Sequence, residues 1–115
     1  MSEREIKNLL EDIYDSAGKI ITYTQGMSFD DFMQDEKTID AVVRNFEIIG
    51  EAANKVPNDF KAEHPEIEWQ RIIGFRNRII HEYFGIDYKI LWKIKQQNIP
   101  ILSELIEKIL NNFST

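Results

Sequence analysis

Four residues in one short stretch of the chain, Arg76, Asn77, His81 and Tyr83, have side chains that could do chemistry. Histidine is the side chain best suited to proton transfer near neutral pH. Arginine always carries its positive charge, so it can hold an anion. The Tyr83 hydroxyl is a third polar group, although most tyrosines at such positions are amphipathic core residues. The stretch could therefore combine proton transfer with anion binding.

Arg76 interrupts an apolar helical pattern. Position 76 lies one heptad after Trp69 and one heptad before Tyr83, where the predicted helix should carry an apolar residue. An arginine on such a face implies a partner anion, a cleft or a subunit interface, because an unpaired charge is costly to bury. The alternatives are a snorkelling side chain or an internal ion pair with a carboxylate such as Glu51.

His81 lies near the predicted end of the same helix. A helix turns roughly 100° per residue, which places His81 about 140° around the axis from Arg76, so one regular helix does not bring the two together. Asn77 precedes His81 by one turn on the same face, so these two can pair locally. The alternative is that His81 interacts only with the last carbonyls and the negative end of the helix dipole.

The charge of the chain is unevenly distributed. The net charge is −6, but residues 1–69 sum to −9 while residues 70–95 sum to +4. A local basic surface can attract phosphate on an acidic protein, because screening confines the effect to roughly 8 Å at physiological salt. We therefore take four basic residues as candidates for phosphate contact, with a solvated helix face as the alternative: Arg71, Arg78, Lys89 and Lys93.

Several function classes are excluded or weakly supported. The chain has no cysteine, which excludes disulfides, thiolate zinc sites and thiol nucleophiles. His64 is the only other histidine, so the case for a metal site is weak, and no Gly-rich phosphate loop, G-x-S-x-G or H-E-x-x-H motif occurs. The start of the chain carries no secretory signal pattern, and no apolar run reaches membrane-spanning length. We expect a cytoplasmic protein.

The elements that must position these residues are helices. The length of 115 residues fits one domain, 1–115. Apolar residues at helical spacing predict helices over 2–21, 39–56, 69–85 and 87–113, with a capped turn at 28–32 and one helical turn between Pro57 and Pro65. Pro100 predicts a kink in the last helix. No segment has the pattern of a strand hairpin. The predicted fold is an all-α, four- to five-helix up-and-down bundle.

The stretch from Arg76 to Asp87 resembles the signature of the HepT-like branch of the HEPN superfamily. The spacing Arg-x4-His-x-Tyr is met by Arg76, His81 and Tyr83, and Asn77 supplies a polar residue directly after the arginine. Other parts of the chain are also similar to that family, and together they span nearly its whole length: Asn45, Gly50-Glu51-Ala52-Ala53 and Trp69.

This resemblance implies a metal-independent endoribonuclease without a cofactor, the toxin of a type II toxin-antitoxin system whose antitoxin is a nucleotidyltransferase. It implies a homodimer in which the Arg and His motifs of both subunits form one composite cleft for RNA. His81 would act as acid or base on the RNA 2′-hydroxyl, Arg76 would stabilise the phosphorane, and Asn77 would orient His81 or hold a phosphate oxygen. Tyr83 matches the tyrosine that the partner enzyme modifies with AMP.

Two other functions remain open. The chain could be a non-catalytic HEPN partner or scaffold that only binds the nucleotidyltransferase or a nucleotide. A metal-binding bundle is a weaker possibility. An assay of RNA cleavage in the presence of a chelator distinguishes the ribonuclease from a non-catalytic partner. Elemental analysis of the purified protein tests for a metal-binding bundle.

Overall fold

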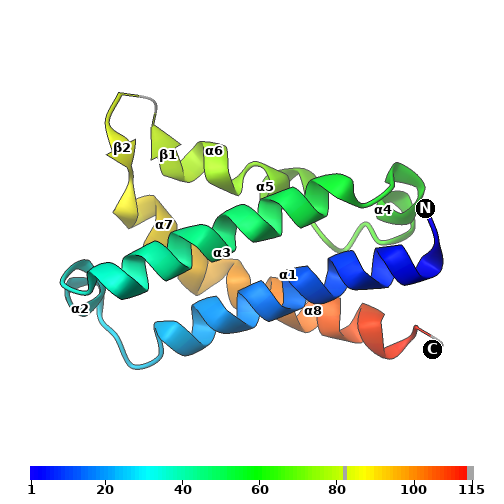
Figure 1. Cartoon of the computed structure of the whole chain (residues 1–115), viewed down its shortest axis with the longest axis horizontal. Coiled ribbons are helices and arrows are strands. Elements are labelled where there is room, and N and C mark those ends of the chain that lie inside the picture. The colour runs from blue at the N-terminus through cyan, green and yellow to red at the C-terminus, as the bar shows by residue number, and fades with distance from the viewer. Residues whose placement is uncertain (82, 114–115) are drawn as a thin grey trace.

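The computed structural model describes residues 1–81 and 83–113, and most of this backbone is helical (Figure 1). The longer helices are α1 (Glu3–Tyr23), α3 (Glu36–Lys55), α7 (Tyr88–Gln97) and α8 (Ile99–Asn111). The shorter elements are α2 (Phe29–Met33), α4 (Asn58–Glu63), α5 (Trp69–Ile73), α6 (Phe75–Ile79), β1 (Ile80–His81) and β2 (Gly85–Ile86). The predicted helical domain is confirmed, and a small hairpin is added to it.

The two longest helices, α1 and α3, begin at side-chain caps. The Ser2 hydroxyl accepts a hydrogen bond from the Glu5 backbone N–H at 3.1 Å, and Asp35 accepts one from the Thr38 N–H at 3.1 Å. A cap of this kind stabilises a helix by about 1 kcal/mol. Helix α1 packs against both α3 and α8, which places it between them (Figure 1).

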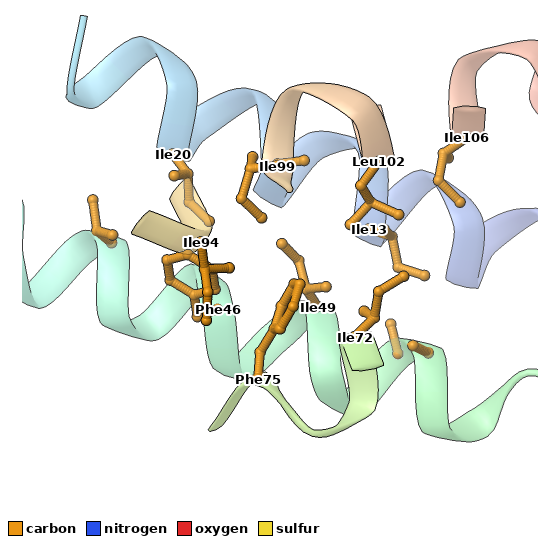
Figure 2. Close-up of a cluster of buried hydrophobic side chains, with 14 of the residues drawn as sticks. Ile13, Ile20, Phe46, Ile49, Ile72, Phe75, Ile94, Ile99, Leu102 and Ile106 are labelled. Carbon is orange, nitrogen blue, oxygen red and sulfur yellow. The ribbon is translucent and has the colours of Figure 1, made fainter. Parts of the chain in front are cut away.

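The apolar faces of the helices meet in one core, drawn in Figure 2. Phe46 of α3 and Phe75 of α6 make an edge-to-face contact with ring centroids 5.9 Å apart. Phe75 and Ile79 are both buried, and they lie one turn apart on α6. Because these two side chains anchor α6 to the core, the residues between them, 76–78, face outward.

Gly50 lies where α3 packs against α5. A Cβ at this position would lie 3.5 Å from the carbonyl oxygen of Ile73, and the neighbouring Ala53 is fully buried. Glu51, between them in sequence, is exposed. The small residues of this string therefore have a packing role, while Glu51 faces solvent.

The helix predicted over 69–85 is interrupted. Helix α5 ends at Ile73, Gly74 separates it from α6, and α6 begins at Phe75 and lasts only to Ile79. A break of this kind resets the helical phase, so the heptad spacing from Trp69 does not reach Arg76. The prediction that Arg76 lies on an apolar face is therefore wrong: its side chain is exposed next to the buried Phe75.

The prediction that no hairpin occurs is also wrong. Strands β1 and β2 pair antiparallel, with Ile80 opposite Ile86 and His81 opposite Gly85. Gly85 has a φ of 76°, the left-handed region that glycine adopts without strain. The sequence pattern assigned this glycine to a helix end, but its conformation serves a turn between two strands.

The other turns agree more closely with the prediction. Ser28 and Asp31 form a reciprocal capping box at the start of α2, and α4 is the short helical turn expected between two prolines. The predicted kink at Pro100 is wrong, because two helices occupy this region in place of one. Pro100 lies in the first turn of α8, after α7 has ended at Gln97, where proline is tolerated because the N–H it lacks would have no helical partner.

Candidate active site

His81 is positioned by the hairpin rather than by a helix. It is the last residue of β1, and the hairpin returns through Gly85 to the start of α7. The Asp87 backbone N–H donates a hydrogen bond to the Ile79 carbonyl at 2.7 Å, which ties the start of α7 to the end of α6. The imidazole therefore lies where two helix ends meet.

Asp87 is the charged residue that contacts the His81 side chain. Its Oδ2 lies 3.6 Å from the imidazole Nε2, while its Oδ1 accepts a hydrogen bond from the Ile90 N–H at 3.1 Å as the N-cap of α7. The His81 and Asp87 side chains are 45% and 36% exposed, so solvent or a ligand can reach both. The apolar pattern places Asp87 only at the start of the helix predicted over 87–113. Its contact with His81 follows from the hairpin, which that pattern does not show.

Arg76 and Asn77 are exposed on α6. The proposed ion pair with Glu51 does not form among the described residues, and neither does the local pair of Asn77 with His81, because the chain leaves the helix at Ile79 before one full turn is complete. The angle of 140° between Arg76 and His81 does not apply for the same reason, since His81 lies on a strand.

One open hollow of about 400 Å³ adjoins the imidazole. This volume is within the usual range for small-ligand sites. The hollow is formed by α2, the hairpin and the start of α7, and its lining residues are Phe29, Met33, His81, Phe84, Ile86, Asp87, Tyr88 and Lys89. Of the four predicted phosphate-contacting residues, Lys89 is therefore brought beside His81.

The other basic candidates are distributed over several surfaces. Lys93 is exposed one turn after Lys89 on α7, and Arg78 is exposed on α6. Arg71 on α5 makes an ion pair with Glu68 at 3.0 Å and lines a different cavity. Lys95 is also engaged elsewhere: its ammonium lies 4.4 Å from the centre of the Trp92 ring, and partial burial lowers its pKa.

Two aromatic residues form the tip of the hairpin. Tyr83 and Phe84 are 86% and 88% exposed, which is unusual for large aromatic side chains in a monomer of this size. The core role considered for Tyr83 is therefore excluded, and its hydroxyl is accessible.

Within residues 1–81 and 83–113, no three histidine or carboxylate side chains gather as a metal site requires. No helix in this part of the chain is long and apolar enough to cross a membrane.

The structure thus defines a small helical domain with an exposed histidine on a hairpin, beside a lysine in the first turn of the next helix. Comparison with protein families shows which class this is: the model for "Ribonuclease HepT-like" matches residues 13–109. The chain belongs to the HepT-like ribonuclease family.

Named relatives cover nearly the whole chain. A protein of Thermococcus cleftensis named "Probable ribonuclease HepT" is 45% identical over 107 residues, covering 93% of this chain and 97% of the relative. A candidate RNase of Methanocaldococcus jannaschii is 40% identical over 107 residues, covering 93% and 98%. Another, from Caldanaerobacter subterraneus, is 40% identical over 101 residues, covering 88% and 90%. No solved structure matches the chain significantly.

Proposed function

We propose that this protein is a metal-independent endoribonuclease in which His81 carries the proton transfer. The observation that carries the proposal is the accessible imidazole held beside Asp87, at a hollow that also contains Lys89, in a chain of the HepT-like family. An ammonium at the edge of the hollow suits an anionic backbone, and aromatic side chains suit bases.

The reaction needs no group beyond the RNA and these side chains. His81 removes the proton from a 2′-hydroxyl, the oxygen attacks the adjacent phosphorus, and the bond to the 5′-oxygen breaks. The products are a 2′,3′-cyclic phosphate and a 5′-hydroxyl, which receives the proton that the imidazolium holds. Arg76 stabilises the charge on the phosphorane, and Asn77 holds a phosphate oxygen.

We propose further that the complete site belongs to a homodimer. Arg76, Asn77 and Arg78 are exposed on α6 and have no ion pair within the described part of the chain. A second subunit that packs near the hairpin would bring its own arginine and histidine toward the same cleft. Light scattering tests this directly, because a monomer at micromolar concentration would contradict a composite site.

The biological role that fits this family is that of a toxin neutralised by a nucleotidyltransferase antitoxin. In this proposal the partner transfers AMP to the Tyr83 hydroxyl. The exposure of Tyr83 at the hairpin tip supports it, because a transferase must reach the phenol. The added negative charge, on the hairpin that also carries His81, would repel an RNA backbone.

The decisive experiment is cleavage of single-stranded RNA in EDTA by protein that mass spectrometry shows to be free of AMP. We expect His81→Ala and Arg76→Ala to lose activity. His64→Ala is the matched control, because His64 is the other histidine and pairs with Glu66 away from the hollow. Equal, negligible cleavage by wild type and His81→Ala would favour a non-catalytic partner of the nucleotidyltransferase.

A further inference from the structure

Asp87 has two separate contacts, one for each carboxylate oxygen. Oδ1 accepts the Ile90 N–H at 3.1 Å and so caps α7, whereas Oδ2 lies 3.6 Å from His81 Nε2. The cap fixes the rotation of the carboxylate, because turning it would break the hydrogen bond that starts the helix. Oδ2 therefore stays directed at one edge of the imidazole.

We propose that Asp87 is a positioning residue for His81, an inference that rests on the proposed ribonuclease function. At 3.6 Å the contact is longer than a hydrogen bond, but a carboxylate can only attract a proton, so its charge favours the neutral imidazole that carries its hydrogen on Nε2 and leaves Nδ1 free. Nδ1 is then the nitrogen that takes the proton from the 2′-hydroxyl. This is the logic by which a buried aspartate orients the histidine of serine proteases.

Two substitutions separate this role from capping. In Asp87→Asn the amide oxygen keeps the cap, since only an oxygen can accept the Ile90 N–H, and the amide nitrogen then faces His81. This nitrogen donates, so Nε2 must accept and the hydrogen moves to Nδ1. Asp87→Ser keeps a capping hydroxyl but places nothing at Oδ2. Because Asn, Ser and Asp cap helices about equally, both variants should melt close to wild type.

The kinetic test is RNA cleavage by the full chain. We expect Asp87→Asn to lower kcat by roughly 100-fold or more with KM within about threefold, because the base nitrogen is blocked. The fall in kcat should be smaller for Asp87→Ser, because nothing in this variant blocks the base nitrogen. Asp35→Asn is the matched control, since Asp35 caps α3 with the same 3.1 Å geometry but has no contact with His81. Equal cleavage by Asp87→Asn and wild type would overturn the proposal, as would equal losses in Asp87→Asn and Asp87→Ser.

A second measurement needs no RNA. The ring nitrogens of His81 can be observed by ¹⁵N NMR, and the chain has only two histidines, so His64→Ala assigns the signals. We expect protonated Nε2 in the neutral ring of the wild type and protonated Nδ1 in Asp87→Asn. Unchanged ring nitrogens in that variant would overturn the proposal. Absence of cleavage in the wild type would count against the ribonuclease function alone, because the NMR result decides the contact between Asp87 and His81 independently.

Discussion

Replacing Gly85 by alanine should strain the hairpin that carries His81. Gly85 has a φ of 76°, and an L-residue in this left-handed region has a conformational free energy higher by roughly 1–2 kcal/mol. A Cβ built at this position meets no atom of the described residues within 4 Å, apart from its chain neighbours, so crowding adds nothing. The expected penalty is therefore about 1–2 kcal/mol, all of it from the backbone conformation.

The strain should reach the site because Gly85 pairs with His81. Strands of two residues give a hairpin little stability of its own. A change of 1–2 kcal/mol shifts a conformational equilibrium by a factor of roughly 5–30. We expect Gly85→Ala to open the hairpin in a substantial fraction of molecules and to lower RNA cleavage about fivefold or more.

Gly26→Ala supplies the matched control. Gly26 also has a φ of 76° and also has open space at its Cβ, but it lies in the turn after α1. Urea unfolding followed by tryptophan fluorescence measures stability, and RNA cleavage measures the site. We expect both variants to be strained but only Gly85→Ala to lose activity. Full activity in Gly85→Ala would refute the argument that the hairpin turn holds His81 in place.

Three further predictions concern packing, pH and RNA binding. Phe75→Ala removes a ring that is 1% exposed, so the free energy of unfolding in urea should fall by about 3–5 kcal/mol. Hydrogen bonds from Thr38 hold the pKa of Asp35 below its ordinary value of 3.8, so Asp35 stabilises the fold above that value and loses this contribution as pH falls through the lowered pKa. Asp35→Asn should therefore reduce the loss of unfolding free energy between about pH 7 and about pH 2. If Lys89 and Lys93 each contact one phosphate, Lys89→Ala and Lys93→Ala should each reduce the slope of log affinity against log salt by about 0.7, measured by fluorescence anisotropy with single-stranded RNA; unchanged slopes would exclude these contacts.

The long helices could be predicted because their signals are repeated many times. Helix α1 has a capping serine and an apolar stripe of which Leu10, Ile13 and Ile20 are fully buried. Many residues must agree before such a stripe appears, so one ambiguous position does not change the prediction.

The region of the site could be predicted only in part, because its elements are too short to show a period. Helices α5 and α6 have five residues each, and apolar residues continue across Gly74 as if one helix passed through it. The strands have two residues each, so no alternation can be seen. His81 was recognised by its residue type and motif spacing, whereas the proximity of Asp87 depends on a tertiary turn that this local pattern does not encode.

A chemical change at the exposed hairpin tip should have little effect on the stability of the fold. Tyr83 is 86% exposed and contributes almost no buried surface, so a group attached to its hydroxyl would neither fill a cavity nor displace a packed side chain. Modified and unmodified molecules should therefore unfold at nearly the same temperature. The two forms would then differ in mass and charge rather than in stability.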